Sequence, residues 1–159
     1  MEVPGDRYVA HTLAITEVLV QLHEAHHIGL LDVLERQTEP TCWRTYIGPM
    51  GARQILKPDL FLRVGVGALE DRHFIEIDMA TESSGTLLTK ARRYLAHYRT
   101  GEEQRRHGVY PRVIWAASDG GRVEQILDVL DRLPRIAKDL FLVWTQEDLL
   151  AQLVLEAHE

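Results

Sequence analysis

The sequence predicts an α/β fold in which a mixed central sheet is flanked by helices. Two kinds of segment alternate along the 159 residues: helical patterns with apolar residues every three or four positions, and short apolar or alternating runs typical of strands. Their order is helix, three strands, helix, strand, helix, strand, helix. No internal repeat, low-complexity tract or linker divides the chain. We therefore predict one domain over residues 1–159.

Composition places the chain among ordinary globular proteins. Hydrophobic residues make up 45% and charged residues 26%, which is typical of folded domains and excludes disordered and fibrous classes. A single cysteine, Cys42, cannot form an internal disulfide, as is usual in a reducing cytosol. No leader opens the sequence, and no apolar run approaches the roughly 20 residues of a membrane span. The expectation is a soluble, cytoplasmic protein with no membrane partner.

The first half of the chain predicts one long helix followed by three strands. Apolar residues recur at helical spacing over residues 8–31, with no interior glycine before Gly29. A polar connection follows, and then segments with the alternation and the glycine and proline punctuation of strands and turns. The predicted segments are a strand at 42–47, a loop at 48–58, a strand at 59–66, a turn at 67–72 and a strand at 73–80.

The second half predicts alternating helices and strands. Residues 86–99 have helical propensity and spacing, and residues 110–118 form the near-continuous apolar run of a buried strand. An amphipathic helix, a strand and a closing helix extend this pattern at the carboxyl end. Their predicted ranges are 122–133, 140–145 and 146–157.

Three acidic residues fall at the predicted sheet. Asp59 opens the second strand, while Glu76 and Asp78 share one face of the third because side chains alternate along a strand. If these two strands pair as a hairpin, the acids converge, and clustered carboxylates repel unless a cation or protons intervene. Mg²⁺ or Mn²⁺ would suit such oxygen ligands and would activate water against a phosphodiester.

One segment of this acidic chain is basic. The formal net charge is −6, yet residues 90–112 hold seven basic and two acidic residues. The segment is either a solvated helix face or a strip that contacts the phosphates of DNA. The candidate nucleic-acid-binding residues are Lys90, Arg92, Arg93, Arg99, Arg105 and Arg106.

The segment "KPDLFLRVGVGALEDRHFIEIDMATES", followed by Lys90, the helix with Tyr94 and Tyr98 and then "YPRVIW", resembles the replication-relaxation proteins of plasmids and other mobile elements. Their pattern looks like a variant of the PD-(D/E)xK nuclease superfamily. The resemblance implies a restriction-endonuclease-like core of helix, three strands, helix and strand, with an additional helix, strand and helix at the C-terminus. Such proteins commonly carry an amino-terminal winged-helix DNA-binding region. The sequence shows no such region, so the expectation is that it represents the nuclease-like half and that a winged-helix partner or domain supplies the rest.

The resemblance assigns roles to particular residues. Asp59, after Pro58, matches the "PD" element, and Glu76 matches the acid of the second element. The implied metal ligands are Asp59, Glu76, the backbone carbonyl of Ile77, and Glu17 from the first helix.

The usual lysine is absent from the second element. Asp78 stands in its place, and Lys90 of the following helix is the candidate replacement. Asp78 alternatively accepts amide hydrogen bonds from the turn at residues 81–85. Glu17 alternatively forms a salt bridge, and Tyr94 packs at the core edge or reaches a phosphate.

The expected function is metal-dependent nicking or cleavage of DNA in plasmid or mobile-element replication or mobilisation, with Glu76, Asp59, Asp78 and Lys90 as catalytic residues. A two-fold dimer would suit cuts in two strands. The alternative is a catalytically inactive nuclease-fold module that binds DNA or a protein.

A zinc-hydrolase motif competes with this interpretation. His23 to His27 matches H-E-x-x-H, in which two histidines one turn apart bind zinc. No convincing third ligand follows in the sequence, so partly exposed helix histidines are the simpler explanation. The sequence contains no phosphate-binding G-x-x-x-x-G-K-[ST] loop, and Cys42 has no neighbour that would activate it, so it is expected in the core.

Overall fold

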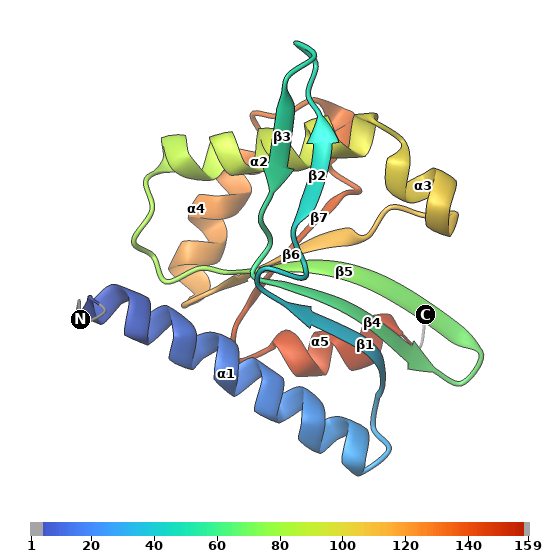
Figure 1. The fold of residues 1–159 in the computed structure, drawn as a ribbon. Helices are drawn as coiled ribbons and strands as arrows, with labels where there is room; N and C mark the ends of the chain where they lie inside the picture. Colours follow the sequence, from blue (N-terminus) through green and yellow to red (C-terminus); the bar gives the residue numbers. More distant parts are fainter. Residues whose placement is uncertain (1–4, 158–159) are drawn as a thin grey trace.

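The computed structural model describes residues 5–157 and shows a five-stranded mixed sheet with the strand order β1-β4-β5-β6-β7 (Figure 1). Strands β1, β4 and β5 are antiparallel, whereas β5, β6 and β7 are parallel. The predicted mixed sheet flanked by helices is therefore confirmed. The strands are β1 (Asp32–Thr38), β4 (Leu60–Val66), β5 (Leu69–Ile77), β6 (Arg112–Ala117) and β7 (Phe141–Thr145).

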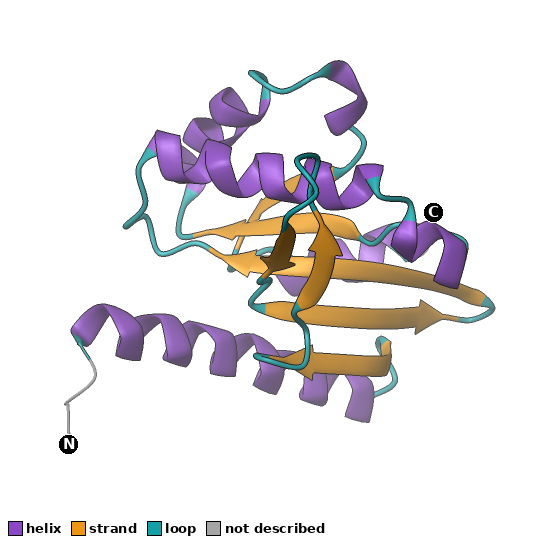
Figure 2. Ribbon diagram, turned by 45° about the horizontal axis from the view of Figure 1, so that its top comes forward, coloured by secondary structure: helices purple, strands orange, loops and turns teal. Residues whose placement is uncertain are grey.

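Helices cover both faces of the sheet (Figures 1 and 2). Helices α1 (Asp6–His27) and α5 (Leu149–Glu156) pack on one face, and α2 (Ser84–Arg99) and α4 (Gly120–Leu130) pack on the other. Alternation along β5 divides its side chains between two cores: Ile75 faces α1 and α5, whereas Phe74 faces α2. No helix within residues 5–157 combines the length and apolar character needed to cross a membrane.

The first predicted strand, at residues 42–47, does not belong to the main sheet. The main sheet begins instead with β1, in the polar connection predicted after the first helix. This edge strand alternates between exposed and half-buried positions and so has no strong apolar pattern. Glu35 forms an ion pair with Arg63, its cross-strand neighbour in β4, so polar residues support this edge of the sheet.

Residues 42–47 instead contribute to a separate two-stranded ribbon, which we call the arm (residues 44–56). Its strands are β2 (Arg44–Ile47) and β3 (Arg53–Leu56), and the second of these falls in the predicted loop. The arm projects from the body beside α2 (Figure 1). The buried side chain of Tyr46 joins the core on the α2 side, which anchors the base of the arm.

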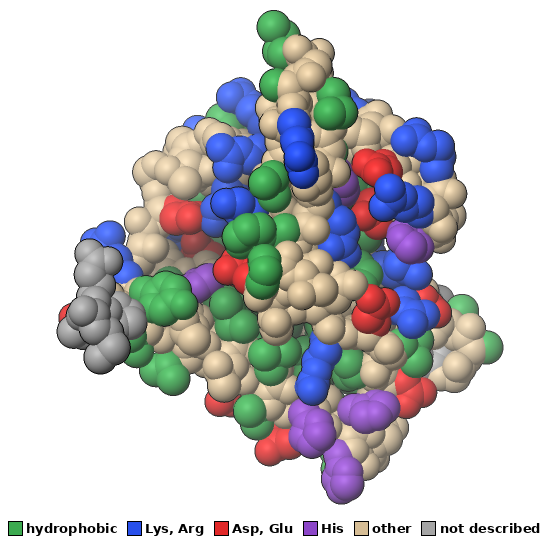
Figure 3. Space-filling model, viewed as in Figure 1, with side chains coloured by type: hydrophobic (Ala, Val, Ile, Leu, Met, Phe, Trp, Pro, Cys, Tyr) green, Lys and Arg blue, Asp and Glu red, His purple; other side chains and the backbone are tan. Residues whose placement is uncertain are grey.

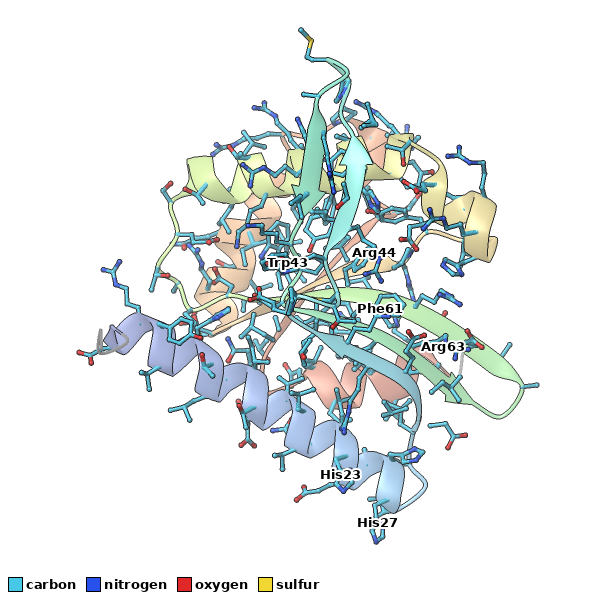
Figure 4. The ribbon with its side chains drawn as sticks, viewed as in Figure 1. His23, His27, Trp43, Arg44, Phe61 and Arg63 are labelled. Atoms are coloured by element: carbon cyan, nitrogen blue, oxygen red, sulfur yellow. The ribbon has the colours of Figure 1, made fainter. Side chains whose placement is uncertain are left out.

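Arg44 holds the same base of the arm in place. Its guanidinium lies 5.0 Å from the centre of the Phe61 ring, and its Nε lies 3.2 Å from Glu103 of α3 (Glu102–His107) (Figure 4). Helix α3 was not predicted. The predicted turn at residues 67–72 is also too long, because Val66 pairs with Leu69 across a two-residue turn. Gly67 has a φ of 62° there, which glycine adopts without strain.

Candidate functional site

A cleft of about 270 Å³ opens where β4 begins and β5 ends. Antiparallel pairing of Leu60 with Ile75 brings the residue before β4 beside the carboxyl end of β5. The predicted hairpin is therefore present. The cleft is lined by Asp59, Glu76, Ile77, Asp78 and Lys90 among the residues that the sequence singled out, and by Arg7, Tyr8, His11, Met79, Thr81, Glu82 and Trp115.

Asp59 is held rigidly at the cleft. Its Oδ2 accepts a hydrogen bond of 2.7 Å from the amide of Ile77 and one of 3.2 Å from Nε2 of His11 in α1. The hydrogen bond with Asp59 raises the pKa of His11, although burial acts in the opposite direction. Within residues 5–157, every hydrogen bond to the Asp59 carboxylate goes to Oδ2, which leaves Oδ1 for a ligand.

His11 is a cleft residue that no local sequence pattern singles out. Arg7 and His11 lie one turn apart on α1 and both line the cleft. The signal was therefore a pair of basic residues on one helix face, but nothing local to α1 indicates that this face meets Asp59.

Glu76 is a buried carboxylate on the α2 side of β5. The Tyr94 hydroxyl donates to its Oε1, and the Lys90 ammonium lies 3.4 Å from its Oε2. Burial raises the pKa of Glu76 to about 7, and the nearby charge of Asp59 adds to this effect, which Lys90 and Tyr94 only partly offset. The negative charge of Asp59 therefore disfavours ionisation of Glu76 in the same cleft.

Lys90 reaches the cleft from α2. Ser83 caps that helix by accepting a hydrogen bond from the amide of Thr86, and Lys90 lies one turn before Tyr94, so both side chains meet Glu76. The Lys90 ammonium is also 2.8 Å from Glu82. Burial lowers the pKa of Lys90, but Glu76 and Glu82 outweigh it and raise the pKa above its ordinary value. The side chain therefore stays charged.

Asp78 lies at the cleft but is paired with a buried cation. Both of its oxygens accept hydrogen bonds from Arg122 of α4, at 2.7 and 2.9 Å, and the amide of Ala80 donates to Oδ2 at 3.2 Å. Both side chains of the ion pair are buried. Arg122 neutralises Asp78 in this arrangement, and the ion pair holds the loop after β5; a catalytic role for Asp78 stays a prediction.

The sequence contained a signal for Arg122 that our helix prediction missed. Leu127 of α4 is 47% exposed although it is apolar. The buried face instead contains Arg122, Ile126 and Val129, which follow one another at spacings of four and three residues. An arginine in line with buried apolar residues indicates a buried acidic partner.

Glu17 lies away from the cleft, so the structure does not bring this predicted ligand together with Asp59 and Glu76. Its side chain is exposed and accepts a hydrogen bond of 3.0 Å from Gln21. The sheet-facing side of α1 carries Val18, Leu22 and Ala25, which turns Glu17 toward solvent. Nowhere in residues 5–157 do three His, Cys, Asp or Glu side chains gather as a metal-ligand set.

The histidine motif does not form a zinc centre of three side chains in this part of the chain. His23 and His27 are exposed near the carboxyl end of α1 (Figure 4). His11 lies in the other half of that helix. His26 accepts a hydrogen bond from the amide of Val33. Cys42 is buried, as expected, and burial raises the pKa of its thiol to about 12.

The predicted basic strip is divided among three places. Lys90 points into the cleft. Arg92, Arg93 and Arg99 line a second hollow beside α2. Arg106 on α3 pairs with Glu102 at 2.8 Å, and Arg105 donates to the carbonyl of Thr100.

The elevated pKa of Glu76 predicts a pH-dependent stability. Its folded value of about 7 exceeds the ordinary value of 4.5, so the folded state binds more protons than the unfolded state between these pH values. The free energy of unfolding therefore falls as pH rises through this window. Without divalent metal, we expect the wild type to lose up to about 3 kcal/mol relative to Glu76→Gln. Urea unfolding measured from pH 4.5 to 8 tests this, and parallel profiles for the two proteins would contradict it.

Comparison with known proteins identifies the family. Residues 1–113 match the replication-relaxation family, a range that contains Asp59, Glu76 and Lys90 but ends before Arg122. No curated protein and no solved structure matches the chain. Because the match covers more than half of the sequence, the protein belongs to the replication-relaxation family.

Proposed function

We propose that the protein is a divalent-metal-dependent domain that nicks DNA. Membership of the replication-relaxation family indicates a role in the replication or mobilisation of plasmids or other mobile elements. The observation that carries the proposal is the meeting of Asp59, Glu76 and Lys90 in one cleft. Two acids and a charged ammonium are the groups that metal-dependent phosphodiester cleavage requires.

The topology supports a restriction-endonuclease-like core. Helix α1 is followed by the antiparallel strands β1, β4 and β5, then by α2 and by β6, which is parallel to β5. This order agrees with the helix, three strands, helix and strand of the superfamily once the arm is treated as an insertion between β1 and β4. Helix α4, strand β7 and helix α5 then form the C-terminal extension.

The donors present suit Mg²⁺ or Mn²⁺. Asp59, Glu76 and the main-chain carbonyl of Ile77 would hold the ion, and waters would complete its coordination, since Mg²⁺ commonly binds one or two carboxylates. The burial and mutual repulsion of the two acids, expressed in the raised pKa of Glu76, are what a bound cation would relieve. The ion would supply Lewis acidity and an activated water.

The remaining residues would position these donors and stabilise charge. His11 and the amide of Ile77 orient the Asp59 carboxylate, and Tyr94 orients Glu76. The Lys90 side chain is one-third exposed, and its ammonium would face the scissile phosphate and offset the charge that develops on it.

A second candidate is a non-catalytic nuclease-fold module that binds DNA or a protein. The observation in its favour is that Asp78, at the position of the superfamily's lysine, forms a buried ion pair with Arg122. This module would bind without turnover, so the two candidates differ in a single measurable property.

The test is nicking of supercoiled plasmid. We expect the wild type to produce open-circular DNA with Mg²⁺ or Mn²⁺ and none with EDTA, and Glu76→Ala to lower the rate at least about 100-fold. Glu24→Ala, which alters an exposed acid on α1, is the matched control and should retain full activity. If the wild type does not nick DNA, or Glu76→Ala nicks it equally, the non-catalytic module is the better assignment.

A further inference from the structure

A second hollow of about 650 Å³ lies between the arm, α2 and the segment that follows α4, and we call it the arm groove. Four arginines line it: Arg92, Arg93 and Arg99 from α2, and Arg132 from beyond α4. The arm contributes Pro49 and Gln54, and none of the acidic residues within 5–157 belongs to the lining. The groove is therefore a concave surface with one sign of charge.

The positive charge of these four arginines is not neutralised by any acidic side chain within residues 5–157. All four are exposed, and within residues 5–157 none of them forms an ion pair with an acidic side chain. Arginines elsewhere do so: Arg106 pairs with Glu102, and Arg112 with Glu156. Figure 3 shows Lys and Arg side chains over α2 beside the arm. Unpaired arginines in a hollow focus a positive potential that attracts a polyanion.

The arm extends this surface outward. It is a two-stranded antiparallel ribbon with Met50 at its tip, 93% exposed, and Pro49 beside it. Ile47 of β2 and Ile55 of β3 are also exposed. A two-stranded ribbon has the width that the major groove of duplex DNA admits, and an exposed apolar side chain such as Met50 would make apolar contacts with base edges there.

Lys57 enlarges the basic surface at the foot of the arm. A smaller hollow next to the arm groove is lined by Gln54, Ile55, Lys57 and Arg93. Arg93 therefore belongs to both hollows, and Lys57 carries the positive surface past the end of β3. The ammonium of Lys57 lies 4.5 Å from the centre of the Trp43 ring, which holds the side chain without neutralising it.

We propose that the arm groove binds duplex DNA, with arginines of α2 and Arg132 on the phosphates and the tip of the arm in a groove of the helix. This inference rests on the proposed function, because DNA is also the polymer that the cleft would cut, and it names the double-stranded form as the one bound. On α2, Lys90 of the cleft lies next in sequence to Thr89 of the arm groove. One duplex therefore has a short path from the groove to the cleft.

The test is binding of a fluorescent duplex of about 25 base pairs, measured by anisotropy in EDTA over a range of salt concentrations. For Arg93→Ala/Arg99→Ala we expect an affinity at least about tenfold lower and a slope of log K against log salt that is smaller by about 2, because two phosphate contacts are lost. Arg36→Ala, at an exposed arginine of β1, is the matched control and should leave the slope unchanged.

Met50→Ser tests the arm without changing charge. We expect weaker binding to duplex with the wild-type salt slope, since an apolar contact releases no counterions. Met50 and the four arginines are exposed, so these variants should fold, and their melting temperatures serve as a check.

Several outcomes would overturn the inference. If Arg93→Ala/Arg99→Ala binds as tightly as Arg36→Ala, the arm groove does not contact DNA. Tighter binding of single-stranded DNA or of double-stranded RNA than of duplex DNA would overturn the assignment to duplex. Because EDTA removes metal-dependent turnover, these results do not depend on the cleft: binding with no nicking would refute only the proposed nuclease activity, and nicking without involvement of the arginines would refute only this inference.

Discussion

Arg122→Ala is expected to lower the free energy of unfolding by about 3–5 kcal/mol, because it leaves the buried carboxylate of Asp78 without its cation. Arg122 donates two hydrogen bonds to Asp78 and a third, of 2.9 Å, to the carbonyl of Glu82. Removing the guanidinium thus frees both ends of the loop between β5 and α2. Urea unfolding at pH 7 measures the loss.

Two further variants separate the ion pair from general effects of arginine removal. Arg132→Ala removes an exposed arginine and should change the stability by no more than about 0.5 kcal/mol. Asp78→Asn combined with Arg122→Ala should recover part of the loss, because no uncompensated charge is then buried. A loss below about 1 kcal/mol for Arg122→Ala would show that the pair does not hold this loop.

The same loop connects stability to the proposed activity. Glu82, whose carbonyl Arg122 holds, places its carboxylate 2.8 Å from the Lys90 ammonium. We therefore expect Arg122→Ala to reduce nicking as well, at temperatures where it remains folded.

Lys90→Ala is expected to lower the rate of metal-dependent nicking by about 10²–10³-fold, the usual effect of removing one group that stabilises charge in the transition state. The ammonium lies 3.4 Å from Glu76 and stays protonated because Glu76 and Glu82 raise its pKa. Lys90→Arg keeps the charge in a larger planar group and should retain intermediate activity. Rates on supercoiled plasmid under saturating Mg²⁺ measure the difference.

A pH profile distinguishes this role from a structural one. Without the Lys90 cation the pKa of Glu76 rises further, since Lys90 normally lowers it, so the acid limb of the pH–rate profile should move to higher pH. Lys138→Ala, at an exposed lysine that pairs with Asp131, is the control and should leave rate and profile unchanged. A Lys90→Ala rate equal to the control would remove Lys90 from the mechanism.

Features set by local pattern were predictable. Alternation along residues 73–80 places Glu76 on the same face as Phe74, and the structure shows both on the α2 side. Helical spacing in residues 86–99 puts Lys90 one turn from Tyr94, and both meet Glu76. Because these periods depend only on backbone geometry, the sequence determines which side chains share a face.

Partners that come from distant segments were not predictable. The packing of α1 on the sheet decides that His11 contacts Asp59 and that Glu17 faces solvent. The packing of α4 decides that Asp78 pairs with Arg122. The edge strand β1 and the arm likewise contain short, polar-rich strands whose pairing is decided by their neighbours. The sequence by itself therefore determined which side chains share a face of β5 and of α2, whereas only the tertiary structure decided which charges neutralise the acids, because that choice is made by contacts between residues far apart in the chain.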